Sequence, residues 1–116
     1  MYLQSSTDRE IDKWFQSDAT CHELYPQAIR DMARRHWTPL LVARKASGFL
    51  ATEPGAKILD IGSGAGKFCL AAAYYQPKLQ FTGVEQRAYL VDYANAALKQ
   101  TGQDNVNFIN ANFTQI

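Results

Sequence analysis

The chain has 116 residues, of which 47% are hydrophobic, and a formal net charge of +1. This composition predicts one compact globular unit with an apolar core and excludes a disordered chain. The near-neutral charge gives no electrostatic indication of nucleic acid, although a basic patch within a neutral total would not show in that sum. No apolar run is long enough to span a bilayer, and the N-terminus lacks signal-peptide features, so we expect a cytoplasmic protein with no membrane partner. The spacing of cysteine and histidine predicts no metal site.

The first 54 residues are predicted to be helical. Thr7 to Glu10 reads as a capping box in which Thr7 is the N-cap. Ile11, Trp14 and Phe15 then fall on one face of a helix. Pro26 suits the first turn of a further helix, because its missing N–H group has no partner there in any case.

A second helical start follows at His36-Trp-Thr-Pro39. Thr38 is expected to be the N-cap and Pro39 the first helical residue. The helix predicted over residues 40–50 is amphipathic, with an apolar stripe made of Val42, Ala46, Phe49 and Leu50. Glu53-Pro-Gly-Ala56 reads as a turn.

Strand, glycine-rich turn and helix succeed one another from Lys57 onward. The apolar run Ile58 to Ile61 predicts a buried parallel strand, and a helical pattern follows over residues 68–75. Between them the chain carries alternating glycines, at positions 62, 64 and 66, which permit sharp turns and close approach to a ligand. A dinucleotide-binding fingerprint would place its third glycine where Lys67 stands.

The remaining elements continue the alternation. Leu79 to Val84 predicts a second strand that Glu85 closes, Leu90 to Leu98 a helix that Gly102 ends, and Val106 to Ile109 a third strand. Right-handed crossovers would place about three parallel strands side by side in an incomplete, doubly wound α/β sheet. Such a sheet leaves an uncovered edge and an exposed apolar face, so we expect the chain either to associate with itself through that edge or to be only marginally stable.

Ligands of such sheets bind outside the carboxyl ends of the strands, where several polar residues gather. Glu85 follows the glycine loop by the interval usual for a ribose-binding acid, and its carboxylate has acceptors for both ribose hydroxyls. Asp60 lies just before the loop, where an unpaired carboxylate would be unfavourable without a cationic partner. The loop amides and the helix start are predicted donors for an anionic group.

These residues resemble the class I S-adenosylmethionine-dependent methyltransferases. Ile58 to Gly66 looks like the first motif of that family, and Phe81 to Glu85 and Asn105 to Phe113 follow in the expected order. The resemblance covers roughly the second half of the chain. It implies a Rossmann-like fold whose N-terminal half binds the cofactor S-adenosylmethionine, with residues 1–54 forming a helical segment over the site and residues 55–116 the first half of the cofactor domain.

The resemblance also implies which residues contact the cofactor. Asp60 would receive the ammonium group and Glu85 the ribose, while Asn112 stands where the family often has an aspartate that accepts from the adenine amino group. The Trp37-Thr38-Pro39 step resembles one in some amino-methyltransferases that meets the methionine end. Trp37 or Tyr25 is a candidate to face the sulfonium. The full expected set is Thr38, Asp60, Gly62, Ser63, Gly64, Ala65, Gly66, Glu85, Gln86, Asn112 and Phe113.

The reaction implied is transfer of a methyl group to an acceptor that the sequence leaves open among RNA, DNA, protein and small molecules. No residue is assigned as a catalytic base, and the Asn/Asp-Pro-Pro-aromatic motif of amino-methyltransferases is absent from the sequence. Two alternatives remain: a non-catalytic binding module with the same fold, and a nicotinamide or flavin oxidoreductase domain. Lys67 at the third-glycine position disfavours the second alternative.

Overall fold

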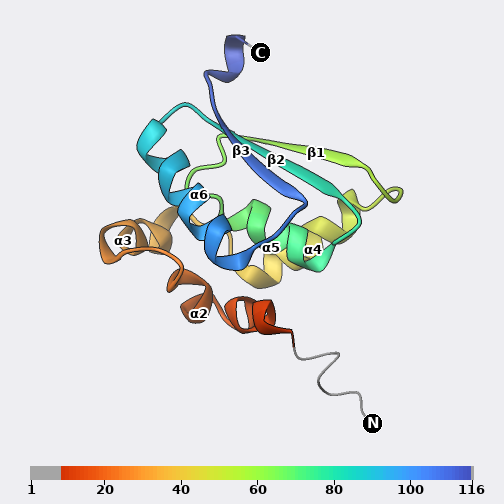
Figure 1. Cartoon of the computed structure of the whole chain (residues 1–116), viewed down its shortest axis with the longest axis horizontal. Coiled ribbons are helices and arrows are strands. Elements are labelled where there is room, and N and C mark those ends of the chain that lie inside the picture. The colour runs from red at the N-terminus through yellow and green to blue at the C-terminus, as the bar shows by residue number, and fades with distance from the viewer. Residues whose placement is uncertain (1–8, 116) are drawn as a thin grey trace.

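A computed structural model describes residues 9–115, apart from the side chains of residues 33–35 and 115. A helical segment comes first, and strands and helices then alternate (Figure 1). The elements are η1 (Glu10–Phe15), α2 (Asp18–His22), α3 (Gln27–His36), α4 (Leu40–Leu50), β1 (Lys57–Ile61), α5 (Lys67–Tyr75), β2 (Gln80–Glu85), α6 (Ala88–Thr101), β3 (Val106–Asn110) and η2 (Phe113–Gln115). The predicted α/β organisation is therefore confirmed.

The strands of the described chain form one parallel sheet in the order β1-β2-β3. Ile58, Phe81 and Val106 lie side by side on one face, which the helices cover, and the ring of Phe81 is fully buried there. Consecutive parallel neighbours joined by helices are the arrangement that the alternating pattern predicts. The carboxyl ends of all three strands consequently lie at one edge of the sheet, beside the glycine loop.

The opposite face of the sheet is open in the described chain. Leu59, Ile61 and Ile109 point to that face and are 55%, 43% and 42% exposed. Figure 1 shows the helices gathered on the other side of the sheet. The exposed apolar face expected of a three-stranded sheet is therefore present, whereas self-association through its edge stays a prediction.

Helix α5 lies close against the sheet because its middle is built from small residues. Ala71, Ala72 and Ala73 are buried, with at most 1% of their surface exposed. The side chain of Asn105 fixes the end of this layer by donating to the carbonyl groups of Ala73 and Leu79, at 3.2 and 3.0 Å. The buried amide is thereby satisfied, as the low dielectric of the interior requires.

The helical segment is joined to the body by buried contacts. The ring of Phe15 stacks on that of Tyr74, with 4.5 Å between the ring centroids. The predicted cap Thr7 lies outside the described residues, and the described helix η1 begins at Glu10, where the carboxylate of Asp12 accepts from the N–H of Arg9 at 2.8 Å.

The predicted start of α4 was wrong by one residue. The helix begins at Leu40 with Pro39 at the N-cap, and the Leu40 N–H donates to the carboxylate of Asp18 at 2.9 Å. Thr38 is therefore not the cap, because a carboxylate 22 residues upstream in sequence supplies the acceptor in its place.

The predicted apolar stripe of α4 was also wrong. Val42 is 50% exposed and Phe49 is 87% exposed, whereas Leu40, Ala43 and Ser47 form the buried face. Small side chains on that face let α4 pack against α5. Ser47 is buried without an unpaired hydroxyl because it donates to the carbonyl of Arg44 at 2.9 Å.

Candidate functional site

The glycine loop connects β1 to α5 through three residues with positive φ. Gly62, Gly64 and Gly66 have φ angles of 74°, 60° and 87°, which residues with a Cβ rarely adopt. Open space lies where a Cβ would stand on Gly62 or Gly64. A Cβ on Gly66 would lie 2.5 Å from the ring of Phe108. The first two glycines thus leave the loop open toward a ligand, while the third admits the ring from β3.

A cleft of about 510 Å³ opens beside this loop. Its wall combines the loop, the end of β1, the connection between α3 and α4, and the start of α6. Among the residues predicted to contact the cofactor, the structure brings together Thr38, Asp60, Gly62, Ser63, Gly64, Ala65 and Gly66 on this wall. Met32, His36, Trp37, Lys67, Phe68, Arg87 and Leu90 complete it.

Asp60 presents a half-buried carboxylate to the cleft. Its one hydrogen-bond partner in the described chain is the thiol of Cys69, whose sulfur lies 3.6 Å from Oδ2. Burial raises the pKa of Asp60, and the negative charge of Glu85 raises it further. A carboxylate held in this way has unused acceptor capacity and gains from a cation, which fits the ammonium group of S-adenosylmethionine.

The loop amides are less available than the sequence predicts. Four of them already donate within the chain: those of Gly62 and Ser63 to Val84, that of Gly64 to Glu85, and that of Gly66 to Ser63. Donors for an anionic group remain in the first turn of α5, whose N–H groups have no partner within the helix. The hydroxyl of Ser63 is buried and has no hydrogen-bond partner in the described chain, so it is a further group that a ligand would satisfy.

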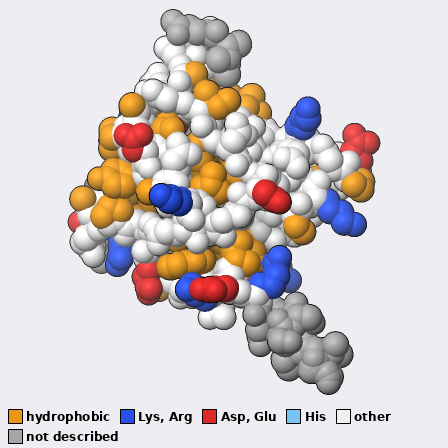
Figure 2. All heavy atoms as spheres, viewed as in Figure 1, with side chains coloured by type: hydrophobic (Ala, Val, Ile, Leu, Met, Phe, Trp, Pro, Cys, Tyr) orange, Lys and Arg blue, Asp and Glu red, His pale blue; other side chains and the backbone are white. Residues whose placement is uncertain are grey.

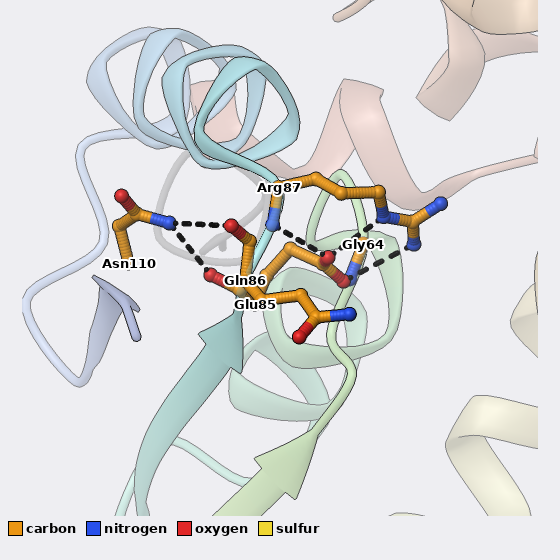
Figure 3. A network of polar contacts seen from close by, with 5 residues as sticks. All are labelled: Gly64, Glu85, Gln86, Arg87 and Asn110. Atoms are coloured by element: carbon orange, nitrogen blue, oxygen red, sulfur yellow. Dashed lines mark hydrogen bonds and ion pairs between the residues drawn. The ribbon is translucent and has the colours of Figure 1, made fainter. Parts of the chain in front are cut away.

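Glu85 lies at the carboxyl end of β2 and is only 3% exposed. Figure 3 shows its carboxylate hydrogen-bonded to the Gly64 amide and to the side chain of Arg87. The hydrogen bond from the Arg87 side chain, followed by those from the Arg87 and Gly64 amides, lowers the pKa of Glu85 to about 2, against the opposing effect of burial. The acid predicted to bind ribose is therefore ionised, beside the loop, and already paired.

The turn after β2 is fixed by Asn110. Its side-chain amide donates to the carbonyl groups of Glu85 and Gln86, at 3.0 and 3.1 Å (Figure 3). Gln86 therefore contributes a backbone carbonyl to this network, and its side chain is exposed and outside the cleft wall. This arrangement holds the backbone of Glu85 in place beside the glycine loop.

The residues predicted for the adenine end lie outside the cleft wall. The side-chain oxygen of Asn112 accepts from the amide and the hydroxyl of Thr114, at 3.0 and 2.7 Å. Phe113 is 51% exposed. Both come shortly after β3, next to Ala111, whose amide donates to the carbonyl of Glu85 at 3.2 Å. This segment therefore lies near Glu85, although neither side chain lines the cleft.

Sequence reasoning missed a buried cluster that ties the helical segment to the loop. Lys67, the first residue of α5, is 4% exposed, and its ammonium lies 2.6 Å from the carboxylate of Asp18 and 2.9 Å from the ring of His22. Burial and the charge of Lys67 lower the pKa of His22, so the ring accepts from the lysine in its neutral form. No sequence spacing signals this contact, because Lys67 lies 49 residues from Asp18 and 45 residues from His22.

Two aromatic residues of the N-terminal helical segment, Tyr25 and Trp37, lie beside the glycine loop. The hydroxyl of Tyr25 is buried and donates to the carbonyl of Ala65 at 2.8 Å. Trp37 packs edge-on against Tyr25, with 4.7 Å between the ring centroids, and forms part of the cleft wall. Of the two aromatic residues predicted to face the sulfonium, Trp37 lines the cleft and Tyr25 lies behind it. In the described part of the chain, no three His, Cys, Asp or Glu side chains gather so as to hold a metal ion.

The sequence is also similar to a known family and to curated proteins. A model described as a methyltransferase domain matches residues 52–116. A tRNA (guanine-N(7)-)-methyltransferase of Synechococcus sp. (strain JA-3-3Ab) is 54% identical over 54 residues, which cover 47% of this chain and 23% of the relative. The protein of the same name from Microcystis aeruginosa (strain NIES-843 / IAM M-2473) is 41% identical over 54 residues, 47% of this chain and 26% of the relative. The chain spans about a quarter of the length of these curated relatives.

Solved structures share the fold. The N-terminal domain of EvdMO1, crystallised in the presence of SAH and D-fucose, has a TM-score of 0.60 at 26% identity, over 71% of this chain and 34% of the other. TrmN from Thermus thermophilus has a TM-score of 0.59 at 21% identity, over 72% of this chain and 26% of TrmN. A SAM dependent methyltransferase from Aquifex aeolicus covers 96% of this chain and 48% of its own, with a TM-score of 0.54 at 19% identity.

Proposed function

The chain belongs to the family of methyltransferase domains, whose cofactor is S-adenosylmethionine, and we propose that it forms the cofactor-binding part of an enzyme that methylates N7 of guanine in tRNA. The observation that supports this acceptor is the 54% identity, over 54 residues, to a tRNA (guanine-N(7)-)-methyltransferase. A coclaurine N-methyltransferase shares the fold at 19% identity, so the fold alone does not identify the acceptor. The family match leaves the nicotinamide and flavin alternatives without support.

The chemistry of guanine N7 agrees with the residues present. N7 carries a lone pair and no proton, as its role as a hydrogen-bond acceptor in the major groove shows. S-adenosylmethionine supplies a methyl group on a positively charged sulfur, so attack by N7 requires alignment and proximity and no catalytic base. A cleft without an assigned base is therefore sufficient for this acceptor, whereas an acceptor that loses a proton would require one.

The side chains of this chain would bind and orient the cofactor. We assign the ammonium group to Asp60, whose carboxylate lacks a strong partner, and the ribose hydroxyls to Glu85 beside Gly64. The aromatic ring of Trp37 on the cleft wall suits the positive sulfur, since cations are attracted to aromatic faces. Thr38 lies on the same wall, which supports its assignment to the methionine end.

We assign the adenine end to the segment after β3. Asn112 and Phe113 lie within two residues of Ala111, whose amide is bonded to Glu85, so they stand next to the ribose position. The side-chain oxygen of Asn112 would accept from the adenine amino group in place of the Thr114 hydroxyl, and the exposed ring of Phe113 would cover the base.

We propose that residues 1–54 form a cover over the cofactor site and that residues 55–116 form the first half of the cofactor domain. The contacts of Tyr25 with the loop and of Lys67 with α2 support this division, because they place the α3–α4 connection on the cleft wall. No helix among residues 9–115 is long and apolar enough to cross a membrane. We place the enzyme in the cytoplasm, where tRNA is found.

A methyl-transfer assay with the protein purified from the cells that naturally produce it would test the proposed acceptor. The protein is tagged, purified from those cells and incubated with methyl-labelled S-adenosylmethionine and an unmodified tRNA transcript. We expect label in 7-methylguanosine, and none in a matched transcript that contains 7-deazaguanine, in which N7 is replaced by a carbon. Glu85→Ala should reduce the rate. Equal labelling of both transcripts, or labelling of another nucleoside, would show that guanine N7 is not the acceptor.

A further inference from the structure

Arg87 stands between the cleft and the acid that is assigned to the ribose. Its side chain is 52% exposed and forms part of the cleft wall, whereas the side chain of Glu85 is 3% exposed and does not. Figure 3 shows the guanidinium lying along the carboxylate, on the side of the Gly64 amide. A ligand in the cleft therefore meets Arg87 before it meets Glu85.

All acceptor positions of the Glu85 carboxylate are occupied by hydrogen bonds. Oε1 accepts from the Gly64 amide at 2.9 Å and from Nη2 of Arg87 at 3.3 Å. Oε2 accepts from the Arg87 amide at 3.0 Å and from Nε of Arg87 at 2.8 Å. A carboxylate offers about four lone-pair sites, and all four are occupied.

Ribose binding therefore requires two of these donors to leave. The two backbone amides are fixed, one by the glycine loop and one by the turn that Asn110 holds. The guanidinium is the donor that can move, because it is carried on a long side chain that is half exposed. The two ribose hydroxyls would replace its two hydrogen bonds.

We propose that Arg87 is a phosphate-binding residue controlled by the cofactor: ribose displaces its guanidinium from Glu85, and the freed guanidinium binds a phosphate of the tRNA. This inference rests on the proposed function. The planar guanidinium matches phosphate geometry, with two parallel N–H donors. Acidic and basic side chains are interspersed on the face shown in Figure 2, in keeping with the net charge of +1.

The displacement couples the two ligands. Cofactor binding frees the cation that the nucleic acid contacts, and by reciprocity a bound phosphate holds Arg87 away from Glu85 and favours the cofactor. The empty cleft, by contrast, keeps Arg87 neutralised by Glu85. The expected result is tRNA binding that strengthens when the cofactor is present.

The first arm of the test measures the affinity for S-adenosylhomocysteine by calorimetric titration. Arg87→Ala removes the competitor of the ribose, so we expect it to bind two- to five-fold more tightly than the unaltered protein, in keeping with the modest strength of an exposed ion pair. Lys78→Ala removes a positive charge from an exposed turn at the other end of the sheet and should leave the affinity unchanged. Weaker binding by Arg87→Ala would overturn the proposal, because Arg87 would then be a cofactor ligand.

The second arm measures how tRNA binding depends on salt, with and without S-adenosylhomocysteine. One additional phosphate contact steepens the slope of log K against log salt by about 0.7–0.9. We expect this gain on adding S-adenosylhomocysteine to the unaltered protein and to Lys78→Ala, and no gain with Arg87→Ala. Arg87→Lys, which keeps the charge, should keep the gain, and thermal melts confirm that each variant is folded.

The outcomes separate this proposal from the function on which it rests. A slope gain that persists in Arg87→Ala would refute the phosphate role while leaving tRNA as the acceptor. Failure of the unaltered protein to bind tRNA would refute the proposed acceptor, and the phosphate role with it. In that case the titration of Arg87→Ala still decides whether the guanidinium and the ribose compete for Glu85.

Discussion

Replacing Asp60 by asparagine should stabilise the protein and weaken its binding of the cofactor. The carboxylate is half-buried, its one hydrogen-bond partner in the described chain is the Cys69 thiol at 3.6 Å, and Glu85 adds a second negative charge. Burial and the charge of Glu85 raise the pKa of Asp60 against the opposing effect of the Cys69 hydrogen bond, so the ionised form opposes folding. Asparagine has nearly the same shape and removes that charge.

Substitutions that remove an unfavourable functional group typically raise the free energy of unfolding by about 0.5–2 kcal/mol, and we expect a gain in this range. For a chain of this size, 1 kcal/mol corresponds to a rise of about 4 °C in the melting temperature. Because the pKa of Asp60 is higher in the folded than in the unfolded chain, the gain is complete above the folded pKa. It disappears as the pH falls below the unfolded value, where both states are protonated.

The effect on binding has the opposite sign. A hydrogen bond between charged groups contributes about 1.5–3 kcal/mol, so losing the contact to the cofactor ammonium should weaken S-adenosylhomocysteine binding by about 10- to 150-fold. Calorimetry with and without this ligand measures both quantities on the same samples. Asp104→Asn, which neutralises an exposed acid at the far end of the sheet, is the matched control and should change neither.

Two results would refute this reasoning. If Asp60→Asn melts at a lower temperature, the carboxylate has a stabilising partner and is not held for a ligand. If the variant binds S-adenosylhomocysteine as tightly as the unaltered protein, Asp60 does not receive the ammonium group.

Three further substitutions test other parts of the site. Gly66→Ala should lower the free energy of unfolding by about 1–3 kcal/mol in urea titrations, because its φ is positive and its Cβ would meet Phe108 at 2.5 Å. Tyr25→Phe leaves the buried carbonyl of Ala65 unpaired and should cost about 1–3 kcal/mol in the same titrations. Glu85→Ala should weaken S-adenosylhomocysteine binding by about 1–3 kcal/mol. Because the folded pKa of Glu85 is depressed to about 2 from 4.5, its contribution to stability, at most about 3 kcal/mol, should be present above pH 4.5 and lost as the pH falls toward 2.

Each of these has a contradicting outcome. An unchanged unfolding midpoint for Gly66→Ala would mean that the loop and Phe108 adjust freely. A Tyr25→Phe protein as stable as the original would mean that water satisfies the carbonyl. Unchanged ligand affinity would remove Glu85 from the site, and a stability difference between Glu85→Gln and the original that does not shrink below pH 4.5 would contradict its depressed pKa.

Local patterns predicted the strands and the glycine loop because their causes are local. The apolar run Ile58 to Ile61 forms a parallel strand as predicted, and positive φ confines the loop positions to glycine. The expectation that this strand is buried was wrong, because β1 is an edge strand of the described sheet and none of its residues is buried. The carboxyl-end rule then placed Asp60 and Glu85 at the same edge of the sheet without any knowledge of side-chain contacts.

What the sequence could not supply depends on residues distant along the chain. The cap of α4 comes from Asp18, so Thr38 looked like the cap on local grounds alone. Ser47 is buried because α5 packs there, which reverses the expected stripe on α4. Arg87 pairs with Glu85 across a turn whose shape appears only in the fold, and no periodicity signals it.

We propose that the cleft beside the glycine loop binds S-adenosylmethionine. Calorimetric titration of the 116-residue chain with S-adenosylhomocysteine, with NAD as the control, tests it most directly. We predict binding of S-adenosylhomocysteine that Asp60→Asn and Glu85→Ala each weaken, and no binding of NAD. Binding of NAD alone, or of neither ligand, would contradict the claim that these residues form a methyltransferase cofactor site.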